Sequence, residues 1–190
     1  MERERCEKYI RLLKQELVPA LGCTEPIAVA YAAAKAAETL GRRPDRIEAR
    51  CSGNIIKNVM GIVVPNSDNR KGINIAATLG AVAGNPAGGL NVLESVGAED
   101  IALCRRLENE GFCRCRLAEG VDSLYVHISA YGGADCAQVF LEGSHTGIVK
   151  IVRNGETVFE KEAEERQEET FAQEMTIVEI LQFAEMADAE

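Results

Sequence analysis

The chain has 190 residues, of which 46% are hydrophobic, and its formal net charge is −9. This is enough apolar material for the core of one domain or of two small lobes, while the acidic balance argues against nucleic acid and anionic membranes as partners. The sequence shows no signal-peptide pattern and no apolar run long enough to cross a membrane, so we expect a cytoplasmic protein.

Seven cysteines are present, an odd number that argues against a framework of disulfides. We therefore expect reduced thiols. Cys113 and Cys115 fall on one face of a predicted strand, where we interpret them as packing residues. The alternative is a zinc site that these two thiols form with a histidine, although no Cys-x-x-Cys motif supports it.

The first half of the chain has mainly helical periodicity. The segment 27–40 is rich in alanine, which suits close packing of one helix on another. An alternating pattern at 46–51 predicts a strand with Ile47, Ala49 and Cys51 on its buried side. Helices are predicted over residues 3–17, 27–40, 55–60, 73–83, 90–96 and 99–110.

From Gly111 onward the period of the sequence changes from helical to alternating. The dipeptide Asn154-Gly155 is a strong hairpin signal. Strands are predicted over residues 112–118, 124–131, 137–142, 147–152 and 156–160. The sequence therefore predicts an α+β fold, in which alanine-rich helices pack with a mostly antiparallel sheet in the second half of the chain.

The C-terminal segment begins with a run of charged residues at 160–174, which is typical of a solvated linker. A helical pattern resumes over 175–186, with Thr176 close to its start. We therefore divide the chain into a domain at 1–160 and, at 161–190, a linker with a C-terminal helix. The apolar side of this last helix needs a covering surface, which predicts a partner subunit or assembly into a homo-oligomer.

Cys23 lies at the start of the alanine-rich helix. Thr24 is a good N-cap residue, and Pro26 is tolerated in a first helical turn. Cys23 is then expected beside unpaired backbone N–H groups, which lower the pKa of a thiol. A thiolate here can bind a metal or attack carbon. The alternative is a small, buried apolar residue at a helix junction.

Two further segments carry polar residues at the ends of predicted elements. The turn at 52–54, Ser-Gly-Asn, leads from a strand into a helix, a geometry that suits a carboxylate, and Lys57 and Asn58 follow closely. The alternative is an ordinary turn with an exposed lysine. His145 lies on a loop between strands, where it faces either a site or water, whereas His127 lies within a strand and is expected to be a surface or core residue.

Four stretches of the sequence resemble one known family. Val-Pro-Ala-Leu-Gly-Cys-Thr-Glu-Pro-Ile-Ala at 18–28 resembles the N-terminal signature of the L-cysteine desulfidase family, which is related to the iron-sulfur L-serine dehydratases. Further agreement lies in Ser-Gly-Asn-Ile-Ile-Lys-Asn-Val at 52–59, Ala-Ala-Thr-Leu-Gly-Ala at 76–81 and Gly-Ser-His-Thr-Gly-Ile-Val at 143–149. Members of that family continue into a second, mostly helical half that supplies more cluster cysteines, so the chain is similar to the N-terminal part of such an enzyme.

The resemblance implies a lyase that converts L-cysteine to pyruvate, ammonia and sulfide, with a [4Fe-4S] cluster acting as a Lewis acid on the leaving group. It implies that Cys23 is a metal ligand, and that Cys23, Lys57 and His145 are catalytic. The substrate-binding residues that it implies are Thr24, Glu25, Ser52, Asn54, Asn58 and Thr146. The general base stays open among Lys57, His145 and Glu25.

The cluster site is expected to be incomplete in this chain alone, because only one of its three required ligands can be placed. Whether the chain is itself an enzyme is therefore left open, and the missing C-terminal half is an expected partner. L-serine is an alternative substrate, since the same chemistry removes water from serine. A non-catalytic amino-acid-binding module without a cofactor is the alternative from another class of function.

Overall fold

A computed structural model describes residues 3–17, 19–161 and 174–187. The chain forms two compact units, one made of Met1–Val18 and Glu162–Glu190 and the other of Pro19–Lys161. The predicted division into 1–160 and 161–190 stays a prediction, although its boundary lies beside the end of the larger unit. Residues 162–173, which hold most of the predicted charged linker, lie outside the described part of the chain.

The smaller unit contains α1 (Arg3–Glu16) and α7 (Ile177–Met186), close to the helices predicted there. The ring of Tyr9 on α1 stacks on that of Phe183 on α7, with centroids 4.9 Å apart. Arg5 Nε lies 2.8 Å from Glu179 Oε1. The Thr176 hydroxyl caps α7 by accepting from the backbone N–H of Glu179. Ring stacking and an ion pair thus join the two helices, while the capping box stabilises the start of α7.

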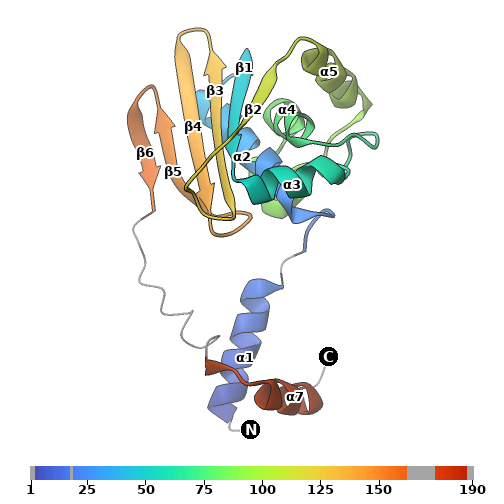
Figure 1. Cartoon of the computed structure of the whole chain (residues 1–190), viewed down its shortest axis with the longest axis vertical. Helices are drawn as coiled ribbons and strands as arrows, with labels where there is room; N and C mark the ends of the chain where they lie inside the picture. The colour runs from blue at the N-terminus through green and yellow to red at the C-terminus, as the bar shows by residue number, and fades with distance from the viewer. Residues whose placement is uncertain (1–2, 18, 162–173, 188–190) are drawn as a thin grey trace. The chain divides into compact units, whose positions relative to one another are not determined.

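The larger unit is built on a mixed sheet with the strand order β2-β1-β3-β4-β5-β6 (Figure 1). The strands are β1 (Arg46–Cys51), β2 (Cys113–Leu117), β3 (Tyr125–Gly132), β4 (Asp135–Glu142), β5 (Ile148–Arg153) and β6 (Glu156–Glu160). β2 pairs with β1 in parallel, and the pairs from β1 to β6 are antiparallel. The predicted α+β class is confirmed.

The sheet also includes β1, which corresponds to the strand predicted at 46–51. β1 belongs to the first half, yet it lies between β2 and β3. The physical reason is that Ile47, Ala49 and Cys51 form an apolar side of β1. A strand in the middle of the sheet buries this side almost completely, which stabilises the fold. The parallel β1–β2 pair also needs a long crossover, which the intervening helices provide.

The helices α2 (Thr24–Leu40), α3 (Gly53–Gly61), α4 (Ile73–Ala83) and α5 (Ala98–Asn109) lie together beside the sheet (Figure 1). α2 packs on β3, β4 and α4, and α4 in turn contacts α5. The predicted helix-on-helix role of the alanine-rich segment is met by this α2–α4 contact. Within the described ranges, no helix is both long and apolar enough to cross a membrane.

The helix predicted at 90–96 is wrong. A 3₁₀ helix, η1 (Pro86–Asn91), occupies the preceding residues, and 92–95 form turns in which Val92 and Leu93 are fully buried. Gly89, with φ +54°, breaks the helical path inside η1. Burial of two apolar residues by a turn looks like a short helical pattern in sequence, which explains the error.

Candidate functional site

The Glu25 carboxylate accepts hydrogen bonds from three side chains. Cys23 Sγ donates to Glu25 Oε2 over 3.0 Å, and Thr24 Oγ1 lies 3.5 Å from the same oxygen. Asn58 Nδ2, from α3, donates to the other oxygen, Oε1, over 3.1 Å. All four residues are partly exposed, so the group can meet a small molecule from solvent. We call Cys23, Thr24, Glu25 and Asn58 the Glu25 cluster.

The start of α2 positions this cluster. Gly22, with φ +90°, turns the chain in a conformation that favours glycine, and Pro26 and Ile27 anchor the first turn in the core. Cys23, rather than the predicted Thr24, is the N-cap residue, and it makes no side-chain cap bond. Its thiol instead points to Glu25. The helix therefore begins earlier than predicted and carries Thr24 and Glu25 in its first turn.

The predicted low pKa of Cys23 is wrong. Burial raises the pKa of the thiol, and the hydrogen bond that it donates to Glu25 raises it further. The backbone N–H groups of Thr24 and Glu25 do lower this pKa, as the sequence suggested, but they are outweighed. The pKa of Glu25 is in turn lowered, first by the Cys23 hydrogen bond and also by the Asn58 hydrogen bond and an electrostatic interaction with His145. The cluster is thus a protonated thiol on an ionised carboxylate.

The α3 helix contributes one polar face to the site. Asn54 and Asn58 are four residues apart and Lys57 lies between them, so the three side chains share one side of the helix. Only Asn58 is seen to bond to Glu25, while Asn54 and Lys57 are exposed to solvent nearby on the helix. The structure therefore brings Asn58 into the cluster and leaves Asn54 and Lys57 beside it.

Ser52 is the N-cap residue of α3, a structural role that was not predicted from the sequence. It is only 4% exposed, and its hydroxyl donates to the Ser123 carbonyl over 2.6 Å while accepting from the backbone N–H of Ile55. Both capacities of the hydroxyl are therefore used within the protein. Ser52 holds the start of α3, and through it the position of Asn58.

Ser52→Ala is expected to lower the free energy of unfolding by about 1–2 kcal/mol, because it removes the cap of α3 and leaves the Ser123 carbonyl without its donor. Urea unfolding followed by circular dichroism measures this. Ser123→Ala is the control, since that exposed hydroxyl bonds only to the neighbouring Asp122 in the described structure. Equal losses from the two variants would contradict the capping role.

The loop between β4 and β5 brings His145 toward the cluster. His145 is half-buried, and its charge acts on the Glu25 carboxyl. Thr146 is exposed, and its carbonyl accepts from the backbone N–H of Ile148 over 2.9 Å. The structure thus places His145 in electrostatic range of Glu25 and gives Thr146 a turn position. His127 lies elsewhere, in β3, where its ring stacks on Phe140.

A metal site is not formed by side chains in the described part of the chain, where no group of three or more His, Cys, Asp or Glu residues could hold an ion. This covers both the [4Fe-4S] cluster, for which Cys23 is the single thiol in the Glu25 cluster, and the zinc site at Cys113 and Cys115. The Glu25 cluster thus offers one of the three protein ligands that an iron-sulfur cluster requires, and this cofactor stays a prediction.

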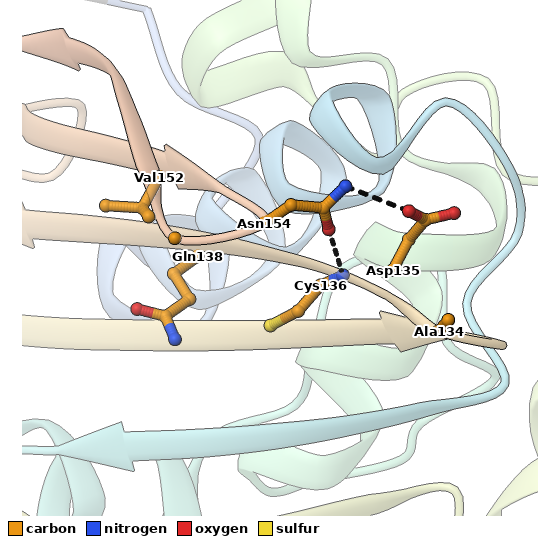
Figure 2. Close-up of a pocket in the computed structure, with 7 residues that line it drawn as sticks. Ala134, Asp135, Cys136, Gln138, Val152 and Asn154 are labelled. Atoms are coloured by element: carbon orange, nitrogen blue, oxygen red, sulfur yellow. Dashed lines mark hydrogen bonds between the residues drawn. The ribbon is translucent and has the colours of Figure 1, made fainter.

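A separate pocket of about 350 Å³ lies where the β3–β4 and β5–β6 turns meet (Figure 2). Asn154 bridges this region: its side chain donates to Asp135 Oδ1 and accepts from the backbone N–H of Cys136, each over 2.9 Å. Gln138 and Val152 line the floor beside it. Sequence reasoning found only the hairpin at Asn154. The polar groups here mainly satisfy each other, so we assign the pocket no function.

Comparison with known proteins gives similarity to proteins named UPF0597. The chain is 47% identical to one from Oleidesulfovibrio alaskensis over 159 residues, which are 84% of this chain and 37% of that protein. It is 42% identical to one from Lachnoclostridium phytofermentans over 185 residues, which are 97% of this chain and 44% of that protein. The chain spans less than half the length of these curated relatives. No family model and no solved structure matches it.

The family assignment made from the sequence is wrong, because these relatives are named UPF0597 proteins and not cysteine desulfidases or serine dehydratases. The fold explains how the motifs misled. The stretch at 76–81 is buried in α4, where small residues are needed for close helix packing, and Ser52 is a helix cap. These residues serve helix packing and helix capping, and such structural roles do not by themselves identify a reaction.

Proposed function

We propose that the Glu25 cluster binds a small α-amino acid, and that this chain is the substrate-binding part of a cytoplasmic lyase that eliminates sulfide from L-cysteine to give pyruvate and ammonia. The observation that carries the proposal is the ionised, partly exposed Glu25 carboxylate, held by Cys23 and Asn58 next to His145. Titratable groups with perturbed pKa values that bond to a polar side chain of another element are typical of reactive or binding sites.

The charges around the cluster match those of an amino acid. The Glu25 carboxylate can accept the substrate's ammonium group. Lys57 and the exposed first turn of α3 at Asn54 can attract the substrate's carboxylate, because a lysine and a helix N-terminus both favour an anion. The substrate side chain would then lie toward Cys23 and His145. A zwitterion of small size satisfies both signs of charge at once.

The residues also offer the proton transfers that elimination requires. A base removes the α-proton of cysteine, and the sulfur leaves as hydrogen sulfide to give aminoacrylate, which hydrolyses to pyruvate and ammonia. Glu25 is ionised, so it is able to accept a proton, while the Cys23 thiol is protonated and able to donate one. His145 acts electrostatically on the Glu25 carboxyl. L-serine, with water as the leaving group, fits the same roles.

A non-catalytic amino-acid-binding module is the second candidate. The observation that favours it is the hydrogen-bonded thiol of Cys23, whose raised pKa makes it a weak nucleophile and a weak metal ligand. Such a module would bind the amino acid and leave it unchanged. Release of sulfide from L-cysteine by the protein, alone or with a partner polypeptide, separates the two candidates.

Glu25→Gln is expected to weaken binding of L-cysteine and L-serine at least tenfold, because the amide keeps the shape of the side chain but carries no charge to form an ion pair with an ammonium group. Isothermal titration calorimetry with each amino acid measures this. Glu38→Gln is the control: it makes the same change on the same helix, where Glu38 pairs with Lys35 at an exposed position. Unchanged affinity in Glu25→Gln would refute the amino-acid site.

The proposal includes assembly with a partner subunit or with further copies of the chain. The apolar side chains that support it lie on the smaller unit, where Leu17, Ile177 and Leu181 are 71%, 77% and 59% exposed. Exposed apolar residues gathered on adjacent turns are typical of interaction surfaces. Light scattering of the purified chain, alone and mixed with the remaining part of a relative, tests this, and a monomer in both samples would count against it.

A further inference from the structure

Four of the seven cysteines belong to neighbouring parts of the sheet and α5: Cys51 on β1, Cys113 and Cys115 on β2, and Cys104 on α5. In the parallel β1–β2 register, Ala49 is opposite Cys115 and Cys51 is opposite Leu117. Side chains two residues apart on a strand share a face, so Cys51 and Cys115 lie diagonally on the same side of the sheet. The two strands thus bring two thiols together.

Diagonal positions on one face of the sheet make the Cys51 and Cys115 thiols neighbours, and each thiol affects the pKa of the other. Their surroundings differ. Cys51 is fully buried in a strand with neighbours on both sides, whereas Cys115 is half-buried on β2, the edge strand of the sheet. An oxidant from solvent can therefore reach Cys115 first. Cys51 is the buried diagonal neighbour of Cys115 on the adjacent strand.

The electrostatics of the pair follow the same order. The hydrogen bond from Cys51 lowers the pKa of Cys115, which favours its thiolate, while the same bond and burial raise the pKa of Cys51. A thiolate that is accessible and adjacent to a second thiol is the arrangement of redox-sensitive cysteines. By contrast, Cys113 is buried and Cys104 is buried, and burial raises the pKa of each.

We propose that Cys115 is a peroxide-reactive thiol and that Cys51 converts its oxidised form to a Cys51–Cys115 disulfide. The Cys115 thiolate attacks one oxygen of a hydroperoxide and breaks the O–O bond, which gives a sulfenic acid and, after protonation, water or an alcohol. Cys51 then attacks the Cys115 sulfur, and a second water leaves. Two thiols lose two electrons and two protons in total, and the peroxide is reduced.

The disulfide would act on the start of α3. Cys51 directly precedes Ser52, the cap of α3, and the backbone N–H of Ala118, just after β2, donates to the Cys51 carbonyl over 2.9 Å. A disulfide would therefore fix β2 to the junction between β1 and α3, the helix that carries Asn58. The proposal concerns the two thiols alone and does not depend on the function proposed for the Glu25 cluster.

The test uses hydrogen peroxide on the full chain, followed by alkylation, non-reducing digestion and mass spectrometry. We expect a disulfide-linked pair of peptides containing Cys51 and Cys115, which dithiothreitol separates. In Cys51→Ala the sulfenic acid of Cys115 should persist, so dimedone should label Cys115 at least tenfold more than Cys104 or Cys113. Cys136→Ala, which removes another half-buried thiol, is the control and should leave the disulfide unchanged.

Two results would overturn the proposal. One is a peroxide-treated wild-type chain in which Cys51 and Cys115 stay reduced while other cysteines oxidise. The other is a Cys51→Ala variant, folded by circular dichroism, in which dimedone labels Cys115 no more than Cys113. The wild-type peptide map needs no substitution, so the first outcome can be read even where a variant fails to fold.

Discussion

Replacing Gly80 with alanine is expected to lower the free energy of unfolding by about 3 kcal/mol or more. Gly80 lies in α4 where this helix contacts α2, and a Cβ atom built on it would be 2.1 Å from the carbonyl oxygen of Ala30. That neighbour is backbone and cannot rotate away, so the two helices must move apart. Overpacking a core costs about 1–3 kcal/mol even when side chains can adjust. Here the backbone itself has to shift.

The matched control is Gly61→Ala, in the last turn of α3. A Cβ at Gly61 meets nothing within 4 Å, so this substitution should be neutral or slightly stabilising, since alanine restricts the unfolded chain more than glycine does. Guanidinium unfolding, followed by circular dichroism, compares both variants with the wild type. If Gly80→Ala unfolds at the wild-type midpoint, the close α2–α4 contact is not as described.

The sequence predicted this contact in kind but not in detail. The run of alanines at 27–40 indicated close helix packing, and α2 indeed packs on α4. Nothing in the local pattern indicates which glycine touches which carbonyl, because that depends on the crossing of two helices far apart in sequence. Hairpin strands were predicted within a few residues for the opposite reason: β3 to β6 pair with their neighbours along the chain.

The position of β1 in the middle of the sheet could not be predicted from the local sequence pattern. Its alternation predicted the strand correctly at 46–51, but its partners β2 and β3 come much later in the chain. The diagonal position of Cys51 relative to Cys115 depends on that topology, and so it could not be inferred from cysteine spacing. Sequence reasoning treated Cys115 as a packing residue because each strand was considered alone.

The sequence indicated which residues belong to the Glu25 cluster better than it indicated their protonation states. Cys23, Glu25 and Asn58 were all named as site residues, and the structure joins them by hydrogen bonds. The sequence pattern pointed to a thiolate at Cys23 because the one influence visible in it was the start of a helix, whose N–H groups lower the pKa of a thiol. Burial and the nearby Glu25 carboxylate reverse that result, and both depend on where the chain folds.

Because of His127, we expect the protein to lose stability as the pH falls from about 6.5 to about 4. Burial in the sheet, with a smaller contribution from Arg50, lowers the pKa of the imidazole to about 4 from its ordinary value of 6.5. Between these values the unfolded chain binds a proton that the folded chain does not, so stability decreases as the pH decreases, and the loss is complete below about pH 4. At full value the difference is about 3 kcal/mol, and solvent screening of this partly exposed ring reduces it to about 1–2 kcal/mol.

His127→Gln should remove this part of the pH dependence, because glutamine does not titrate. The measurement is urea unfolding at several pH values between 4 and 7, with the variant's curve subtracted from that of the wild type so that the carboxylates, common to both, cancel. Ser129→Ala is the control: it removes the hydroxyl that lies 3.2 Å from His127 Nε2 but keeps the imidazole, so it should retain the wild-type slope. Parallel curves for wild type and His127→Gln would mean that the ring titrates alike in the folded and unfolded chain, and that its burial does not keep it neutral.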